Sequence, residues 1–368
     1  MNKYKIAFLI PSLGSGGAER VITTLANNLT ENYEVIIITF DNKQPFYKLN
    51  SQIKHHSCTN LTDIPPSNNT YKALKFNIKL LLEINRISKD EKIDIIISFL
   101  TIANILGILV AKFRKIPIII SERNNPNKEL ISNFWMQIRR KTYPSANYIV
   151  VQTQEIADFY ITKIKNDVVK IIPNPISPDL EIMNSKETKE NIILNVGRLS
   201  NQKGQEMLLK AFTRIESNGW KLVIAGEGEN RVKLEKLIKK LQISDRVLLP
   251  GRIKDVSKLY NKAKIFAFSS NYEGFPNALI EAMHFRLPCV STNCPTGPSE
   301  LIINDINGFL IPVNNEIVMA EKLNILINDS ALRESLGSKA AKTVKKYAIE
   351  SISDRWKKLI ESCLNSNL

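Results

Sequence analysis

The chain has 368 residues, of which 43% are hydrophobic, and this length predicts two globular domains. Lysine and arginine number 51 against 36 acidic residues, so the formal net charge of +15 favours anionic partners such as phosphorylated substrates or acidic lipid. Aromatic residues make up only 7% and no recognisable nucleic-acid-binding motif is present, which argues against a nucleic-acid partner. The four cysteines lack CxxC spacing, so the sequence predicts neither a zinc knuckle nor a disulfide framework and fits a cytoplasmic protein.

In the first half of the chain, short β-branched runs alternate with longer amphipathic runs, as in a doubly wound parallel sheet. The apolar run Ile6–Ile10 is too short for the core of a signal peptide and is interpreted as the first strand. Polar residues interrupt the apolar run Ile95–Ala111, so no transmembrane segment is expected. The predicted strands are Lys5–Ile10, Val35–Phe40, Ile93–Phe99, Ile116–Ser121, Tyr148–Gln152 and Val169–Ile172.

A proline-rich run, residues 173–178, then interrupts helix and strand alike, because proline lacks the amide donor and restrains its neighbour. The alternation restarts with predicted strands at Asn191–Val196, Lys221–Ala225, Val247–Leu249, Ile265–Ser269, Cys289–Thr292 and Phe309–Ile311. We therefore expect domains at residues 1–172 and 191–349, a linker at 173–190, and a C-terminal helix at 350–368 whose packing partner stays open. The expected fold class is α/β, with two Rossmann-like domains whose parallel sheets face each other across a cleft.

The first candidate site is the glycine-containing loop 11–19, between the first strand and the first helix. Gly16 and Gly17 allow close backbone approach, and the following helix start offers amides to a phosphate. A tight turn without a ligand is an alternative. Asp41, which ends the second strand, also keeps a dinucleotide-binding fold open, although the third glycine of GxGxxG is missing.

The second candidate site is the loop 197–204, which follows the first strand of the second sheet. It holds two cations, Arg198 and Lys203, in a polar loop that enters a helix. Such cations are suited to clamping a diphosphate. An exposed cationic loop without a ligand is the alternative.

The third candidate site is the segment 273–281, which presents two carboxylates. Glu273 lies in a loop before a helix that we expect to begin near Asn277, and Glu281 lies about one turn inside that helix. The segment therefore offers two carboxylates and the positive end of a helix, which can meet a sugar, a phosphate and a ribose. A solvated acid followed by an ordinary helical acid is the alternative.

These loops together resemble glycosyltransferase family 4, whose members are retaining transferases of the GT-B fold, and the resemblance extends over nearly the whole chain. It rests on the two glutamates with seven residues between them, the loop 197–204, and the motifs Ala225-Gly226-Glu227-Gly228 and Gly16-Gly17-Ala18-Glu19. Within the family, the chain is similar to bacterial enzymes that extend lipid-linked oligosaccharides, including N-acetylgalactosaminyltransferases of N-glycan assembly. The motifs that carry this closer likeness are Ser98-Phe99-Leu100, Ser121-Glu122-Arg123 and Asn293-Cys294-Pro295-Thr296-Gly297.

The resemblance implies a role for each matching residue. Arg198 and Lys203 would bind the donor diphosphate, and Glu281 would bind the ribose hydroxyls. Glu273 would contact the transferred sugar and is, with Arg198 and Lys203, expected to take part in catalysis. The other donor-binding residues that the resemblance implies are Gly16, Gly17, Gly274, Phe275 and Asn277.

The chain departs from many relatives after the strand that ends at Ser121, where a histidine is common but Glu122 and Arg123 stand here. Its three histidines lie elsewhere, at His55, His56 and His284, which leaves a histidine-based role unsupported. Glu122 and Arg123 are candidate contacts for the acceptor or for a phosphate. A surface or interdomain ion pair is the alternative.

The sequence contains no Asp-x-Asp motif, with which many transferases hold a divalent metal. Fixed cations and helix amides can stabilise the departing diphosphate instead, and removal of one such donor typically costs about 100- to 1,000-fold in rate. We therefore expect a metal-independent reaction without a cofactor, and the resemblance implies retention of anomeric configuration. The predicted function is transfer of a hexose or N-acetylhexosamine from a nucleotide diphosphate sugar, UDP-linked by resemblance, to a lipid-linked or cell-surface glycan.

Three rival functions remain open at this point. A nucleotide-sugar epimerase of the same architecture needs no acceptor. A nicotinamide-dependent oxidoreductase would use the Gly16–Gly17 turn with Asp41. A catalytically silent partner would bind the nucleotide sugar without turnover.

A membrane-side acceptor is suggested by residues 128–143, where an apolar stripe adjoins three cations, Arg139, Arg140 and Lys141, as in an interfacial helix. The stripe consists of Leu130, Ile131, Phe134, Trp135 and Ile138. Burial of the stripe in the core is the alternative, because a helix in a doubly wound domain buries one face. The expected location is therefore peripheral, against anionic lipid on the inner face of the cytoplasmic membrane.

A second predicted helix carries cations that are candidate contacts for an acceptor pyrophosphate, with a solvated face as the alternative. These cations are Lys72, Lys75, Lys79 and Arg86.

Overall fold

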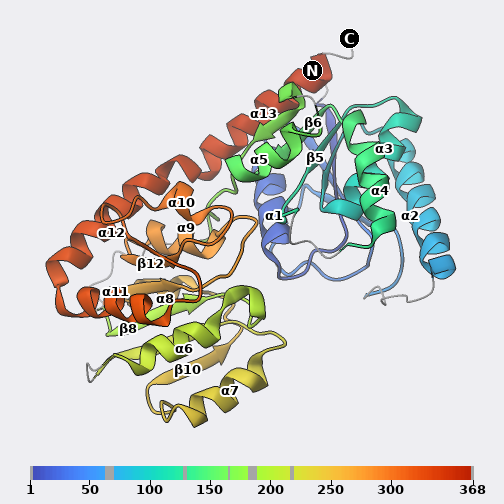
Figure 1. Cartoon of the computed structure of the whole chain (residues 1–368). Helices are drawn as coiled ribbons and strands as arrows, with labels where there is room; N and C mark the ends of the chain where they lie inside the picture. The colour runs from blue at the N-terminus through green and yellow to red at the C-terminus, as the bar shows by residue number, and fades with distance from the viewer. Residues whose placement is uncertain are drawn as a thin grey trace. The chain divides into compact units, whose positions relative to one another are not determined.

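The structure is a computed structural model that describes residues 3–62, 70–126, 131–164, 166–180, 189–215 and 219–365. Its contacts divide the chain into two compact units, shown in Figure 1. The N-terminal unit comprises Met1–Ser177 together with Ile349–Leu368, and the C-terminal unit comprises Pro178–Ala348. Of the predicted linker, residues 181–188 lie outside the described residues.

The N-terminal unit is a parallel sheet with helices on both faces. Its strands are β1 (Lys5–Ile10), β2 (Glu34–Thr39), β3 (Lys54–Ser57), β4 (Ile95–Phe99), β5 (Ile118–Ser121), β6 (Tyr148–Val151) and β7 (Val169–Ile171). Its helices are α1 (Gly17–Leu29), α2 (Thr70–Asp90), α3 (Thr101–Arg114), α4 (Asn133–Thr142), α5 (Gln154–Ile161) and α13 (Ile349–Asn365), with short 3-10 turns η1 (Tyr143–Ser145) and η2 (Asn166–Val168). The order β3-β2-β1-β4-β5-β6-β7 reverses direction between β1 and β4, which is where open parallel sheets usually bind ligands.

The central strands of this sheet, β1, β2, β4 and β5, are largely apolar because helices cover both faces. On one face, alternate residues such as Leu9 and Ile96 join a core with α2, α3 and α5. On the other face, Phe99 stacks on Trp356 of α13 with ring centroids 6.1 Å apart. The C-terminal helix therefore packs on the N-terminal unit, although it follows the C-terminal unit in sequence.

The strand β3 was not predicted. Its sequence, Lys54-His55-His56-Ser57, is polar and only partly buried, and it pairs in parallel with β2 at the edge of the sheet. An edge strand needs no continuous apolar run, so the hydrophobic pattern gave no signal. The other strands are present as expected, with ends shifted by two residues or fewer.

The C-terminal unit is a second parallel sheet with the order β10-β9-β8-β11-β12-β13. Its strands are β8 (Ile192–Val196), β9 (Lys221–Ala225), β10 (Val247–Gly251), β11 (Ile265–Phe268), β12 (Cys289–Thr292) and β13 (Phe309–Ile311). Its helices are α6 (Gln205–Thr213), α7 (Arg231–Lys240), α8 (Ser257–Lys262), α9 (Asn277–His284), α10 (Pro298–Leu301), α11 (Glu316–Asn328) and α12 (Ser330–Val344), with 3-10 turns η3 (Asn201–Lys203) and η4 (Lys345–Tyr347). The direction of winding reverses between β8 and β11, so the loops after these strands are the expected ligand loops.

None of the helices in the described part of the chain combines the length and the hydropathy needed to span a bilayer.

Candidate active site

Hydrogen bonds join the loops that follow β8 and β11 at the switch point of the C-terminal sheet. The Asn271 amide donates to the Gln202 carbonyl at 2.7 Å, and the Ser269 hydroxyl donates to the Lys203 carbonyl at 2.8 Å. Gly204 has a left-handed backbone with φ of 60°, and a Cβ there would collide with the Ser269 carbonyl oxygen. The two predicted ligand loops therefore form one rigid element.

This arrangement brings Lys203 and Glu273 into direct contact. The Lys203 Nζ lies 2.6 Å from the Glu273 Oε1, and the two side chains expose only 20% and 5% of their surface. The Coulomb attraction within an ion pair this sheltered from water is stronger than within one on the surface, because the effective dielectric constant is lower, although desolvation of both groups opposes it. The pair therefore brings together Lys203, predicted to bind the diphosphate, and Glu273, predicted to bind the sugar.

Arg198, the other predicted diphosphate ligand, lies in the same loop and is exposed. Its carbonyl oxygen accepts from the Gln205 side-chain amide at 2.9 Å, so the backbone is held although the residue is exposed. The loop thus carries one cation already engaged with Glu273 and one that is open to solvent.

Glu281 lies inside α9, one turn after its first residue Asn277, as predicted. The carboxylate is buried, and its Oε2 accepts from the Tyr260 hydroxyl at 2.9 Å. Tyr260 is itself fixed by stacking on Phe285, with ring centroids 5.1 Å apart. Tyr260 therefore orients Glu281, the residue predicted to bind the ribose. The sequence gave no signal for Tyr260, because that residue lies on a different helix from Glu281.

The loop after β12 supports Glu273 from the other side. The Glu273 amide donates to the Pro295 carbonyl at 3.2 Å, and the Thr296 hydroxyl donates to the Glu273 carbonyl. Cys294 in the same loop is buried, and burial raises the pKa of its thiol to about 12, so it stays protonated. Only the resemblance to the family pointed to the motif 293–297. In the structure, Pro295 and Thr296 of this motif hold the backbone of Glu273.

The remaining donor residues of the C-terminal unit differ in exposure. Phe275 is buried, and its ring meets that of Tyr347 with centroids 6.0 Å apart. Gly274 and Asn277 on either side of it are partly exposed. Phe275 therefore anchors the loop by its side chain, and donor contact by all three residues stays a prediction.

In the N-terminal unit, Gly16 and Gly17 lie at the start of α1, as expected for the loop after β1. Gly16 is the N-cap in an extended conformation, and the carboxylate of Glu19 lies so close that a Cβ on Gly16 would collide with it. The first turn of this helix thus already has an acidic group beside its positive end. Asp41, the ribose acid of the oxidoreductase alternative, is buried at the end of β2.

Glu122 and Arg123 follow β5, and both side chains are buried, which rules out the alternative of an ion pair on the surface. Glu122 accepts a hydrogen bond from Asn104 at 2.8 Å and another from the Tyr143 hydroxyl. Burial, and then the nearby Glu122 carboxylate, raise the pKa of Tyr143 well above its usual value. Glu122 therefore belongs to an internal polar network.

Arg123 exposes only 8% of its surface and donates from Nη1 to Asn174. Its guanidinium lies over the Phe99 ring, 4.5 Å from the centroid. The Nε and Nη2 atoms have no hydrogen-bond partner among the described residues, and burial lowers the pKa of the group. A cation held in this way is costly, and a contact between Arg123 and the acceptor or a phosphate stays a prediction.

The predicted interfacial helix corresponds to α4, and the prediction for its apolar stripe is wrong in part. Trp135 and Ile138 pack against the core of the N-terminal unit, and Arg139 is buried. Phe134 and Arg140 are exposed. Leu130 lies outside the described residues. The burial alternative therefore holds for Trp135 and Ile138, because this face of α4 packs against the core beside α3.

A cavity of about 580 Å³ is lined by residues of α5, β7 and α13. None of its lining residues belongs to the predicted donor site. No cluster of three or more His, Cys, Asp or Glu side chains suited to a metal ion occurs in the described residues. The metal-independent reaction stays a prediction.

The fold matches that of the Anabaena protein HepE, solved in complex with UDP, with a TM-score of 0.79 at 19% identity. The match covers 97% of this chain and all of HepE. This likeness, with the two parallel sheets, defines a protein of the GT-B class. The family model described as Glycosyltransferase Family 4 matches residues 15–180, and the model described as Glycosyl transferases group 1 matches residues 179–343.

Two curated relatives from Campylobacter jejuni match nearly the whole chain. The first, GalNAc-alpha-(1->4)-GalNAc-alpha-(1->3)-diNAcBac-PP-undecaprenol alpha-1,4-N-acetyl-D-galactosaminyltransferase, is 35% identical over 98% of this chain and 99% of its own length. The second, N-acetylgalactosamine-N,N'-diacetylbacillosaminyl-diphospho-undecaprenol 4-alpha-N-acetylgalactosaminyltransferase, is 32% identical over 93% of this chain and 95% of its own length. The chain is therefore a glycosyltransferase and belongs to family 4. The epimerase and oxidoreductase alternatives receive no support.

Proposed function

We propose that this glycosyltransferase moves a hexose or N-acetylhexosamine from a UDP-sugar to a glycan carried on a lipid diphosphate, with retention of configuration and without a metal. The acceptor class is supported by the two relatives, whose names specify glycans linked to undecaprenol through a diphosphate. The donor class is supported by the resemblance to family 4. The proposed location is peripheral, at the inner face of the cytoplasmic membrane.

The observation that carries this proposal is the Lys203–Glu273 pair, with its nitrogen and oxygen 2.6 Å apart at the switch point of the C-terminal sheet. In the proposed complex, the diphosphate competes with Glu273 for the Lys203 ammonium, since both are anionic. Glu273 then accepts hydrogen bonds from sugar hydroxyls. One sheltered pair thereby gives contacts to both sides of the bond that breaks.

The chemistry follows from charge. As the bond between the anomeric carbon and the diphosphate breaks, the electron pair leaves with the phosphate oxygen and negative charge grows there. Lys203 and the exposed Arg198 stabilise that charge, and the departing phosphate accepts the proton from the acceptor hydroxyl. Glu281, held by Tyr260, binds the ribose and keeps the leaving group in place.

The test incubates the purified protein with UDP-sugars and a diphosphate-linked oligosaccharide acceptor, with excess EDTA in a parallel sample. We expect the acceptor mass to rise by one sugar, UDP to be released, and the rate to persist in EDTA. Complete loss in EDTA that magnesium or manganese restores would overturn metal independence. Isomerised UDP-sugar in the absence of acceptor, with no transfer in its presence, would identify an epimerase instead.

A further inference from the structure

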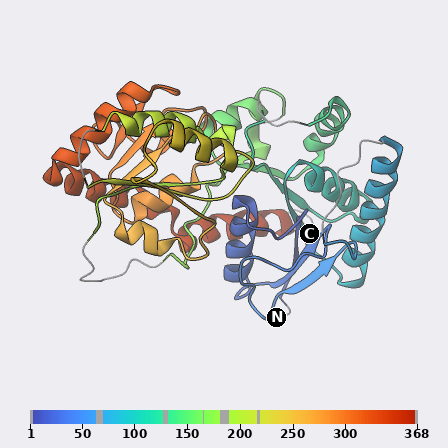
Figure 2. The same cartoon turned by 90° about the horizontal axis from the view of Figure 1, so that it is seen from below.

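Arg123 holds a buried positive charge beside two aromatic rings. The residue follows β5 and exposes 8% of its surface. Its guanidinium carbon lies 4.5 Å from the centroid of the Phe99 ring and 6.0 Å from that of the Trp356 ring. Trp356 belongs to α13, which lies beside α1 on one face of the sheet (Figure 1, Figure 2). Burial lowers the pKa of Arg123 to about 9, which leaves the group charged at neutral pH.

One edge of this guanidinium has no hydrogen-bond partner. Nη1 donates to the side-chain oxygen of Asn174, whereas Nε and Nη2 find no acceptor among the described residues. The two unpaired nitrogens lie on the same edge of the planar group, and together they form a fork that matches the two oxygens of a carboxylate. Buried donors are costly when no acceptor meets them. The fork of Arg123 is therefore suited to an anion that the described part of the chain does not supply.

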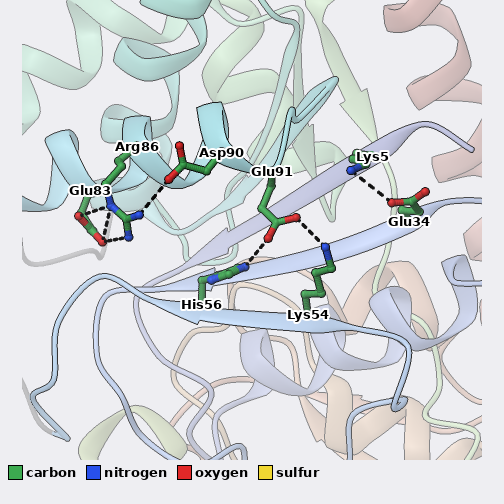
Figure 3. A network of polar contacts seen from close by, with 8 residues as sticks. All are labelled: Lys5, Glu34, Lys54, His56, Glu83, Arg86, Asp90 and Glu91. Atoms are coloured by element: carbon green, nitrogen blue, oxygen red, sulfur yellow. Dashed lines mark hydrogen bonds and ion pairs between the residues drawn. The ribbon is translucent and has the colours of Figure 1, made fainter.

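Arg86 on α2 shows how a carboxylate occupies the same edge of an arginine (Figure 3). Its Nε donates to the Glu83 Oε2 at 3.1 Å, and its Nη2 donates to the Glu83 Oε1 at 2.5 Å. Its Nη1 donates to Asp90 at 2.9 Å, as the Nη1 of Arg123 donates to Asn174. The exposed arginine thus has a carboxylate on its fork, whereas the buried one finds none among the described residues.

Arg123 lies at the edge of the sheet where a ligand is expected, because the carboxyl ends of parallel strands form the usual binding edge. Ser121 of β5 pairs with Val150 of β6, so Arg123 and Gln152 come two residues later in neighbouring strands. The Gln152 Oε1 is a buried acceptor that also has no partner among the described residues. Two unpaired donors and one unpaired acceptor thus follow adjacent strands at this edge.

We propose that Arg123 binds the carboxylate of an acidic sugar, a hexuronate, in the acceptor glycan. The carboxylate accepts from Nε and Nη2 of Arg123, and a neighbouring sugar hydroxyl donates to Gln152. The inference rests on the proposed function and deepens it by naming the class of acceptor sugar. It also separates this chain from the two Campylobacter relatives, whose names specify N-acetylgalactosamine, an uncharged sugar, in the acceptor.

A carboxylate fits this position better than a phosphate does. A carboxylate carries one negative charge, which balances the single charge of a guanidinium. A phosphate monoester carries about 1.5 to 2 charges at neutral pH, so part of its charge would stay buried without a partner. The residues predicted to bind the donor diphosphate, Arg198 and Lys203, belong to the C-terminal unit. The ligand edge of the N-terminal unit is therefore assigned to the acceptor.

Protein atoms cover the fork in this structure, so the guanidinium turns away from the two rings when the acceptor binds. The movement breaks one neutral hydrogen bond, to Asn174, together with the ring contacts. It forms two hydrogen bonds between charged groups, which are about twice as strong as neutral ones. A carboxylate offsets the loss, whereas a neutral hydroxymethyl group does not. Arg123 is therefore a specificity-determining residue that favours an acidic acceptor over its neutral counterpart.

The test compares three diphosphate-linked acceptors that differ only in the terminal sugar, which is a hexuronate, its methyl ester or the corresponding hexose. For each acceptor, kcat/KM is measured with the parent, Arg123→Met and Arg123→Lys. The methionine variant removes the charge and keeps an unbranched side chain, whereas the lysine variant keeps the charge and loses the fork. Arg140→Met, at an exposed arginine of α4, is the matched control.

We expect the parent to favour the hexuronate over the ester and the hexose by at least about 10-fold, the factor that a hydrogen bond to a charged group supplies. This ratio should fall to about one in Arg123→Met and to an intermediate value in Arg123→Lys, and it should persist in Arg140→Met. A parent that shows no preference would overturn the proposal. Equal losses on all three acceptors in a folded Arg123→Met enzyme would also overturn it, because a structural role or a phosphate contact lowers all rates together.

Two further measurements separate the source of the carboxylate and the fate of the proposed function. UDP-hexuronate and UDP-hexose are compared as donors to the hexose acceptor. If Arg123→Met changes this donor ratio and not the acceptor ratio, the carboxylate belongs to the donor and the proposal is wrong. Calorimetry measures binding of the acceptors without a donor. If the parent transfers no sugar but binds the hexuronate acceptor more tightly than the hexose acceptor, and Arg123→Met does not, the proposed function fails and the carboxylate site stands.

Discussion

The loops after β1 and β8 hold the same place in their units but differ in charge. Each follows a strand at the switch point of its sheet and leads into a helix. The loop after β8 carries Arg198 and Lys203, whereas the helix after the first loop has Glu19 against its N-cap Gly16. An anionic diphosphate is attracted to the two cations of the loop after β8 and repelled by the Glu19 carboxylate after β1. Equivalent positions in a fold thus offer a ligand different charges through a few side chains.

The largest expected effect is at Lys203. Lys203→Ala should lower kcat about 100- to 1,000-fold while weakening donor binding less, because the ammonium matters most as charge develops on the leaving phosphate. Lys210→Ala, an exposed lysine near the end of α6, is the matched control and should keep the parental rate. If the Lys203→Ala enzyme is folded and its kcat lies within about threefold of the parental value, the diphosphate does not bind at this loop.

An intermediate effect is expected at Glu281. Glu281→Gln should weaken binding of UDP and of the intact donor alike by about 10- to 100-fold, since a hydrogen bond to a charged group contributes about 1.5–3 kcal/mol. Tyr260→Phe, which removes only the hydroxyl that orients the carboxylate, should weaken both by less. Calorimetry with the two ligands measures this, with the exposed Glu321→Gln as control. Loss of donor binding with intact UDP binding would move Glu281 to the sugar.

The smallest effect is expected in the N-terminal unit, at Arg123. Replacing its buried cation, Arg123→Met, should leave the melting temperature unchanged or raise it, because an imperfectly bonded buried charge stabilises little. It should nevertheless raise the KM for acceptor about 10-fold and leave UDP affinity unchanged, if Arg123 meets the acceptor. Thermal unfolding and steady-state kinetics beside Arg140→Met test this. A large fall in melting temperature with an unchanged KM would make Arg123 purely structural.

Much of the fold could be predicted because buried parallel strands are continuous apolar runs. The runs at Lys5–Ile10 and Lys221–Ala225 match β1 and β9 residue for residue. The strand Lys54–Ser57 could not be predicted in this way, because a strand at the edge of the sheet buries too little side-chain surface to require apolar residues. The stripe of α4 could be recognised as amphipathic, but periodicity alone does not tell whether the protein core or a membrane covers it.

The site was predictable where residues are close in sequence and not where the fold brings them together. The loops with Lys203 and Glu273 were found by charge and glycine, yet their contact depends on the switch point between β8 and β11. Tyr260 and Thr296 support Glu281 and Glu273 from separate segments, and a lone tyrosine or threonine carries no pattern.

The central claim is that Lys203 is shared between Glu273 and the donor diphosphate, and Glu273→Gln tests it most directly. Calorimetry should compare UDP with the intact UDP-sugar on this variant and on the parent. Because the substitution removes the charge that competes for Lys203, we expect UDP to bind as tightly as before or more tightly. The UDP-sugar should bind more weakly, because its sugar loses a carboxylate acceptor. Equal weakening of both ligands would contradict the account.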